Sequence, residues 1–130
     1  MPISNRVFAT GGIGEEWSKS CKEVVPSAKG TCYKVVIKAH LRYEREFHSM
    51  CYLTPTLIFV SGSRSTKDGA DKAVEVFDVD RETWTPIEPL TKGRCRHSSC
   101  GFAEKFVYIF CGMIDRRRVN SIERLDYFGN

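Results

Sequence analysis

The stretch Leu57-Ile58-Phe59-Val60-Ser61-Gly62 is an apolar run that ends at a glycine. Its apolar residues are mostly β-branched or aromatic and the run is too short for a helix, which favours a β-strand. Because the run does not alternate with polar residues, we expect the strand to be buried on both faces. Similar runs precede Gly12 and Gly112, and the three glycines lie at equal intervals of about 50 residues, a period that indicates a structural repeat.

Two further motifs recur in phase with these glycines. An Arg, a His-Ser pair and a Cys occur in residues 45–51 and again in residues 94–100. The segment Val74-Glu75-Val76-Phe77-Asp78 is matched by residues 122–126, and more faintly by residues 22–25. The repeat therefore consists of short β-type segments, and each copy predicts one antiparallel sheet.

An aromatic residue closes the repeat. Trp84 follows Glu75 by about the same number of residues as Tyr33 follows Glu23. We expect Trp84 and Tyr33 to occupy matching places and to pack between adjacent sheets.

In these motifs the chain resembles the Kelch-repeat family, whose members form β-propellers. The resemblance implies an all-β fold, an incomplete Kelch-type propeller of antiparallel four-stranded blades. It covers residues 1–130 and predicts a partial blade over 6–38, a complete blade over 47–87 and a partial blade over 97–128. The residues of the structural repeat motif are Gly11, Gly12, Gly62, Gly112, Trp84, Arg94 and His97.

Three copies are fewer than the roughly four to eight blades of a closed propeller. Two explanations remain open at this point. Either further blades complete the ring, in which case the chain is part of a longer propeller, or copies of the chain associate so that their blades complete it.

Composition is ordinary for a globular protein, with 42% hydrophobic and 28% charged residues and a net charge of +4. We expect no nucleic-acid partner, because this charge gives no broad basic surface. The chain has no run of the roughly 20 apolar residues that a membrane span needs, and residues 1–6 do not resemble a signal peptide. We therefore expect a cytoplasmic protein with free cysteines and no membrane association, although a disulfide-bonded secreted domain is an alternative.

The chemistry-bearing residues do not form a convincing catalytic or metal site. Alternation in a strand would place His97 and Cys100 on opposite faces, which disfavours a metal site beside Cys95. Cys95 lies between two arginines but has no evident general base. Residues 11–14 are glycine-rich but lack the Lys-Ser/Thr element and helix of a phosphate-binding loop. We expect no cofactor, no metal and no catalytic residues.

The connections 13–20, 63–72 and 113–120 differ between copies while the framework repeats, which is typical of a recognition surface. By the symmetry of the blades they should emerge on one face. The candidate partner-binding residues in these loops are Trp17, Arg64, Lys67, Arg116, Arg117 and Arg118. An arginine cluster suits a carboxylate or a phosphate, but Arg116 to Arg118 are equally consistent with a solvated loop tip.

These features favour a non-catalytic protein-interaction module that binds a protein partner or an acidic peptide. An alternative is a fragment of a Kelch-propeller enzyme of the galactose-oxidase-like or sialic-acid-processing type, which the resemblance also implies. A copper site needs several Tyr and His ligands, and the chain has only three histidines, two of them in the repeat framework.

Overall fold

The computed structural model describes residues 6–14 and 18–128 of the chain. Within these residues the secondary structure is β-strand apart from one short 3-10 turn, η1 (Lys67–Gly69). The strands are β1 (Val7–Thr10), β2 (Cys21–Pro26), β3 (Tyr33–Ile37), β4 (Ser49–Thr54), β5 (Leu57–Ser61), β6 (Val74–Asp78), β7 (Thr83–Ile87), β8 (Ser98–Phe102), β9 (Phe106–Phe110), β10 (Met113–Ile114), β11 (Arg117–Arg118) and β12 (Ile122–Asp126).

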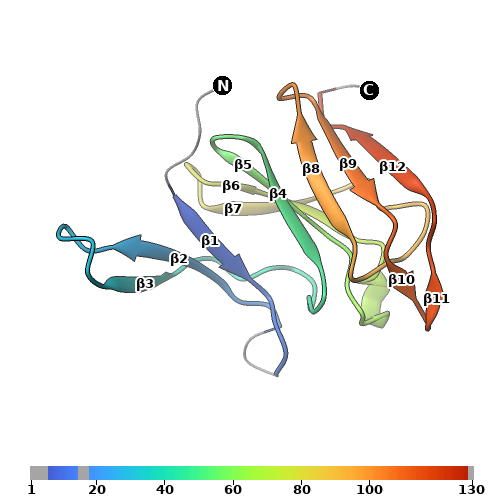
Figure 1. Cartoon of the computed structure of the whole chain (residues 1–130), viewed down its shortest axis with the longest axis horizontal. Helices are drawn as coiled ribbons and strands as arrows, with labels where there is room; N and C mark the ends of the chain where they lie inside the picture. Colours follow the sequence, from blue (N-terminus) through green and yellow to red (C-terminus); the bar gives the residue numbers. More distant parts are fainter. Residues whose placement is uncertain (1–5, 15–17, 129–130) are drawn as a thin grey trace.

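The strands form three successive antiparallel sheets and one small hairpin (Figure 1). The first sheet has the order β1-β2-β3, the middle sheet β4-β5-β6-β7 and the third sheet β12-β9-β8, while β10 and β11 pair with each other. The structure thus confirms an all-β chain of antiparallel blades. The middle sheet has the expected four strands, and its neighbours have three each.

Two hydrophobic cores join the sheets. In the first core, Phe8 of the first sheet meets Phe77 of the middle sheet edge to face at 5.7 Å, and Trp84 stacks on Phe77 at 4.8 Å between ring centroids. The second core lies between the middle and third sheets and includes Phe59 and Ile109. Each sheet therefore buries an apolar face against its neighbour.

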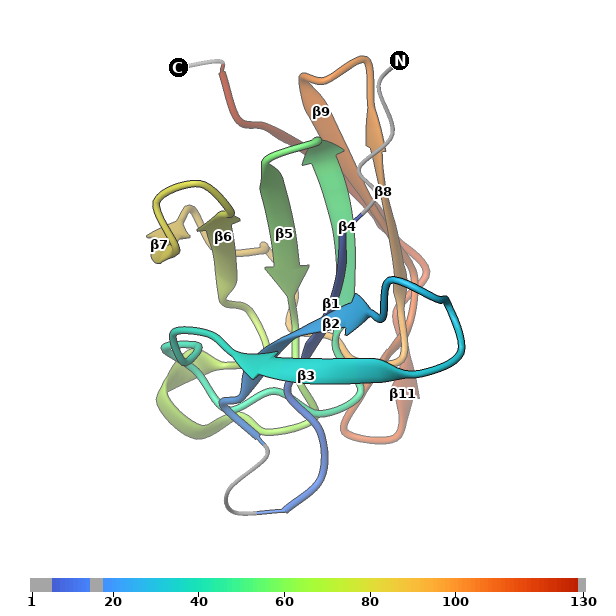
Figure 2. The same cartoon turned by 90° about the vertical axis from the view of Figure 1, so that its left-hand side faces the viewer.

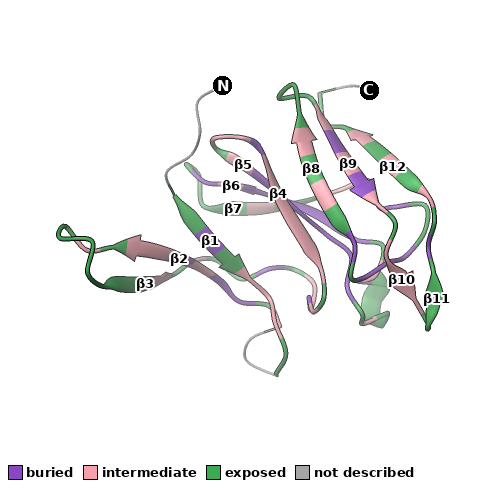
Figure 3. Ribbon diagram, in the orientation of Figure 1, coloured by how far each residue is buried: buried purple, intermediate pink, exposed green. Residues whose placement is uncertain are grey.

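Strand β5 explains why its sequence is apolar without alternation. Ile58 and Val60 contribute to the first core, whereas Phe59, which points to the opposite face of the sheet, contributes to the second. The burial on both faces expected from the sequence is confirmed. Figure 3 shows the same contrast, with buried residues concentrated in β5 and β6 and exposed ones along β3 and β12.

The hydrogen bonds correct the register of the glycines. The backbone N–H groups of Gly11, Gly62 and Cys111 donate to the corresponding carbonyls of Ser20, Ala73 and Ser121 at 2.8, 3.2 and 3.0 Å. All three residues have positive φ, of 63°, 73° and 55°. Gly62 therefore corresponds to Gly11 rather than to Gly12, and the paired positions read Gly11-Gly12, Gly62-Ser63 and Cys111-Gly112. The equal spacing of Gly12, Gly62 and Gly112 does not mark equivalent positions, because Gly62 is at the first of the paired positions, whereas Gly12 and Gly112 are at the second.

Two equivalences in the first sheet are also wrong. Cys21 pairs with Thr10 as Val74 pairs with Ser61, so the residue matching Glu75 is Lys22 and not Glu23. The same register puts Val35, not Tyr33, at the position of Trp84. Tyr33 lies two residues earlier in β3 with 69% of its surface exposed, because it faces away from the middle sheet.

The connections that follow β1, β5 and β9 lie together at one end of the molecule. In Figures 1 and 2 the described parts of residues 11–20, the η1 segment and the β10–β11 hairpin are all at the lower end. This end is called the loop end below. No helix in the described part of the chain has the length and apolar character needed to cross a membrane.

Candidate functional site

A hollow of about 350 Å³ opens at the loop end between the middle and third sheets. Arginines from three separate segments border it. Its lining residues are Arg64, Cys95, Arg96, Met113, Ile114, Asp115 and Arg116.

Two guanidinium groups lie over one aromatic ring beside the hollow. The guanidinium carbon of Arg96 lies 4.6 Å from the centroid of the Phe47 ring, and that of Arg64 lies 5.4 Å from it. Arg64 also pairs with Glu46, with 2.6 Å between Nε and Oε1. In the described part of the chain, Arg96 and Arg116 form no ion pair. Two positive charges at this hollow are therefore available to a ligand.

Backbone hydrogen bonds fix the position of these side chains. The N–H of Arg96 donates to the carbonyl of Phe47 at 2.7 Å, and the N–H of Arg64 donates to the carbonyl of Glu46 at 3.0 Å. Phe47 and Arg96 occupy the same place in successive repeats, and both have positive φ, of 54° and 53°. This left-handed conformation turns the backbone just before β4 and β8 begin.

The β10–β11 hairpin forms the other wall. Cys95 and Met113 exchange two backbone hydrogen bonds of 2.7 and 2.8 Å, which attach the hairpin to the segment before β8. The two hairpin loop residues, Asp115 and Arg116, have φ of 47° and 63°, the signs of a type I′ turn. The turn places Arg116 at the rim of the hollow.

In each of the second and third repeats, a buried arginine side chain bonds to other segments of the same repeat. Arg94 donates from Nη1 to the carbonyls of Cys111 and Ser121 at 3.1 and 2.9 Å, and from Nη2 to Glu123 at 2.5 Å. In the preceding repeat, Nη2 of Arg45 lies 2.7 Å from Oε2 of Glu75, and both side chains are fully buried.

A histidine completes each attachment. Nε2 of His97 lies 2.9 Å from Oγ of Ser61, and Nε2 of His48 lies 2.9 Å from Oγ1 of Thr10. Each ring sits against the glycine that follows this hydroxyl residue. A Cβ on Gly11 would lie 2.5 Å from the carbonyl oxygen of Arg45 and 2.6 Å from Cε1 of His48.

We call this repeated contact the clasp. It consists of an arginine carbonyl and a histidine from one repeat, seated on the hydroxyl residue and glycine of the preceding sheet. One clasp comprises Arg45 and His48 on Thr10 and Gly11, and the other comprises Arg94 and His97 on Ser61 and Gly62.

Two titratable groups near the hollow, His97 and Cys95, are held in their neutral forms. Burial and, to a smaller extent, the nearby charge of Arg94 lower the pKa of His97 to about 4. Burial raises the pKa of the Cys95 thiol above its usual value, although Arg96 acts in the opposite direction. Among the residues of 6–14 and 18–128, no three His, Cys, Asp or Glu side chains gather into a metal-binding group.

The comparisons with known proteins point to one repeat family. No protein-family model matches the chain. It is similar to two F-box/kelch-repeat proteins of Arabidopsis thaliana: At2g44130, with 29% identity over 70 residues and 52% of this chain, and SKIP20, with 30% identity over 50 residues and 38% of this chain. The repeats of this chain are similar to those of Kelch-repeat proteins. The matched parts cover 17% and 12% of the respective relatives.

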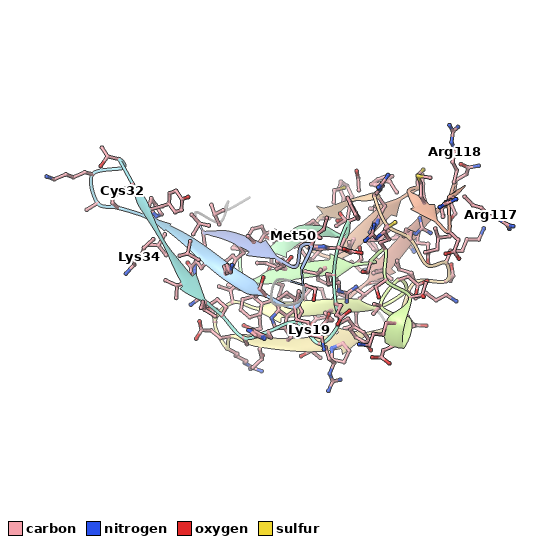
Figure 4. The ribbon with its side chains drawn as sticks, turned by 90° about the horizontal axis from the view of Figure 1, so that it is seen from below. Lys19, Cys32, Lys34, Met50, Arg117 and Arg118 are labelled. Carbon is pink, nitrogen blue, oxygen red and sulfur yellow. The ribbon has the colours of Figure 1, made fainter. Side chains whose placement is uncertain are left out.

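The repeat framework brings together only some of the residues singled out in the sequence. Arg64 and Arg116 meet at the hollow. Lys67 lines a smaller hollow between the first and middle sheets, where its Nζ lies 3.7 Å from Oε1 of Glu44. Arg117 and Arg118 project from β11 at one extremity of the molecule (Figure 4). Trp17 lies outside the described residues.

Sequence reasoning missed Phe47 and Arg96 as site residues. Both were visible as the same position of the Kelch repeat, two residues after an arginine that the repeat retains. Their positive φ values and their contact across two sheets have no direct signature in the sequence.

We expect substitution of Arg45 by alanine to lower the free energy of unfolding by about 3–5 kcal/mol, because Glu75 would be left charged and buried without its partner. Arg81→Ala is the matched control. Arg81 is 84% exposed and lies 3.9 Å from Asp78, so its loss should cost about 0–1 kcal/mol. Urea unfolding monitored by circular dichroism measures both. Equal effects would contradict a structural role for the buried pair.

The clasp histidines should make stability depend on pH. The pKa of His48 and that of His97 are lowered to about 4 in the folded state, below their ordinary value of 6.5, so the unfolded state binds protons first as pH falls. The stability that the neutral rings provide is complete above pH 6.5 and is lost towards pH 4. We expect a loss of about 2 kcal/mol for each histidine between pH 7.5 and 5.

Urea midpoints at these two pH values test this expectation. The variant His97→Asn should show about half the loss of the unaltered chain. His40, an exposed histidine outside the clasp, provides the control His40→Asn, which should keep the full loss. If the His97→Asn variant kept the pH dependence of the unaltered chain, the prediction would be wrong. His97 would then not be a group that the folded state keeps neutral.

Proposed function

We propose that this Kelch-repeat chain is a non-catalytic protein-interaction module that binds an acidic segment of a partner protein at the loop end. The observation that carries the proposal is the meeting of Arg64, Arg96 and Arg116 around one hollow. Two of the three have no ion pair among the described residues, so a carboxylate entering the hollow has guanidinium groups available.

The chemistry of the arginines favours carboxylates. A guanidinium presents N–H groups in a planar fork that matches the two oxygens of a carboxylate. Contact with the Phe47 ring orients the Arg96 guanidinium, so less rotational freedom is lost when a ligand binds. Glu46 is paired with Arg64 and offsets one of the charges, which limits repulsion between the arginines in the free protein.

Apolar residues give the hollow a second feature of peptide sites. Met113 and Ile114 line it beside the charged groups. Its volume is at the lower end of the roughly 300–1,000 Å³ found for small-ligand sites. The hollow therefore suits one or two side chains of a peptide, an acidic residue next to an apolar one.

The conformation of Arg116 supports a binding role. At φ 63° in a type I′ turn, glycine is strongly preferred, and a residue with a Cβ costs about 1–2 kcal/mol. Strained residues of this kind cluster at functional sites. A charged side chain kept at such a position is consistent with a contact to a partner.

The chemistry of the neighbouring groups supports a non-catalytic role in the cytoplasm. Cys95 is buried and its raised pKa keeps it as a thiol, while His97 is committed to the clasp. Reduced thiols such as the buried Cys21 and Cys95 persist in the cytoplasm.

A charge reversal at the hollow tests the proposal. The probe is a fluorescein-labelled peptide of ten residues that alternates Glu with Leu, with a Gln-for-Glu peptide as reference, followed by fluorescence anisotropy. We expect Arg96→Glu to weaken binding of the acidic peptide at least tenfold, which corresponds to about 1.4 kcal/mol. Arg117→Glu makes the same change of net charge on β11 and should leave binding within about twofold.

Two results would contradict the proposal. An equal loss in the Arg117→Glu variant would mean that the peptide senses only the net charge. Equal binding of the Gln peptide would mean that carboxylates are not recognised.

A further inference from the structure

One of the three arginines at the hollow already holds a carboxylate of the chain itself. Nε of Arg64 lies 2.6 Å from Oε1 of Glu46. The side chain of Arg64 is 57% exposed and that of Glu46 is 19% exposed, so a ligand can reach the pair from the side of the arginine. Because a guanidinium makes the same charge-assisted hydrogen bond with any carboxylate, Glu46 stands where an acidic group of a ligand would bind Arg64.

This ion pair is not part of the repeated framework. The N–H of Arg64 donates to the carbonyl of Glu46 at 3.0 Å, and in the next repeat the N–H of Met113 donates to the carbonyl of Cys95 at 2.8 Å. The two backbone contacts are equivalent, but Met113 and Cys95 bring no charges to theirs. The fold therefore makes this contact without an ion pair, and an exposed pair adds little to stability.

The backbone keeps the Glu46 carboxylate beside Arg64. Besides the contact of its carbonyl, the N–H of Glu46 donates to Oγ of Ser63 at 3.3 Å, and Ser63 is fully buried. A carboxylate attached to the chain at this point competes with a ligand as an intramolecular group, at a high effective concentration. A ligand that binds Arg64 must therefore displace a competitor that cannot diffuse away.

Glu46 lies close to the space that a ligand would enter. The guanidinium groups of Arg64 and Arg96 lie over the same Phe47 ring, so both are within reach of one short acidic segment. The charge of Glu46 also acts on Cys95, which lines the hollow. Burial is the main cause of the raised pKa of the Cys95 thiol, and the charge of Glu46 contributes to it.

We propose that Glu46 is an internal competitor for acidic partners. Its carboxylate occupies Arg64 in the free protein, and a carboxylate of the partner replaces it there. This inference rests on the proposed function and adds the residue that sets its selectivity. Arg96 and Arg116 have no ion pair in the described part of the chain, whereas Arg64 binds only a segment that replaces Glu46. Glu46 thus lowers the affinity of the hollow for weakly acidic segments.

Removal of the competing charge tests the proposal, with the same alternating Glu-Leu peptide and fluorescence anisotropy. We expect Glu46→Gln to strengthen binding of the acidic peptide by about fivefold or more. Glu44→Gln is the matched control, because it makes the same change of charge two residues away. Oε1 of Glu44 lies 3.7 Å from Nζ of Lys67 at the smaller hollow, so this variant should bind within about twofold of the unaltered chain. Equal gains in both variants would show an effect of net charge alone and would overturn the proposal.

A double variant separates competition from simple repulsion between Glu46 and the peptide. If the peptide takes over Arg64, the gain in Glu46→Gln depends on that arginine, and adding Arg64→Gln should abolish it. If the double variant bound as tightly as Glu46→Gln, Arg64 would not receive the carboxylate of the peptide and the proposal would be wrong. Urea midpoints close to that of the unaltered chain would confirm that these variants fold.

The unaltered chain reports the exchange without any substitution. The Nε–H of Arg64 donates to Glu46, so its NMR signal should move when the acidic peptide replaces that carboxylate. The Gln-for-Glu peptide should leave the signal in place. A signal that stays in place at saturating acidic peptide would show that Glu46 remains bound, which contradicts the proposal.

The same measurements distinguish this inference from the proposed function. If the unaltered chain prefers the acidic peptide to the Gln peptide but Glu46→Gln binds no more tightly, the function stands and Glu46 is not a competitor. If no form of the chain prefers the acidic peptide, Glu46→Gln included, the proposed function is wrong and this inference fails with it.

Discussion

One contact sets the spacing between neighbouring sheets. In this contact, a histidine ring and an arginine carbonyl pack against a glycine. His48 and Arg45 make this contact with Gly11, and His97 and Arg94 make it with Gly62. The contact forms only if the position is a glycine, the histidine ring is neutral and the arginine side chain is paired with a carboxylate. The hydrophobic cores supply most of the driving force for packing, but apolar contact is non-directional. The clasp therefore fixes how one sheet is oriented relative to the next.

The candidate site is a consequence of the same contact. Arg96 is held between Arg94 and His97, and Phe47 is held in the same way one repeat earlier, so the two meet at a fixed distance across the sheets. The framework is thus largely buried and repeated, whereas Phe47 and Arg96, at matching places within it, are exposed and differ between the copies. This division lets a rigid repeated base carry side chains that differ from one copy to the next.

Much of the fold was predictable because the middle repeat obeys the pattern. The apolar strand at 57–61, the strand at 74–78 and Trp84 lie where the sequence indicated, since burial on two faces leaves a strong signal. Copies that depart from the pattern were misaligned by one or two residues. Cys111 was overlooked because a positive φ at a cysteine cannot be read from its identity, and Tyr33 was mistaken for the counterpart of Trp84 because spacing from Glu23 ignored the pairing. The hollow depends on contacts between segments about 50 residues apart, as in Arg96 on Phe47, which local patterns do not reveal.

The free energy of unfolding of Gly62→Ala, compared with that of Gly30→Ala, tests the clasp most directly. Both glycines have positive φ, of 73° and 68°, so alanine carries the same backbone penalty of about 1–2 kcal/mol at each. Only at Gly62 would the new Cβ collide with the Arg94 carbonyl and the His97 ring, whereas Gly30 has open space around it. We expect Gly62→Ala to lose about 1–3 kcal/mol more than Gly30→Ala in urea unfolding. Equal losses would contradict the claim that this contact fixes the sheets.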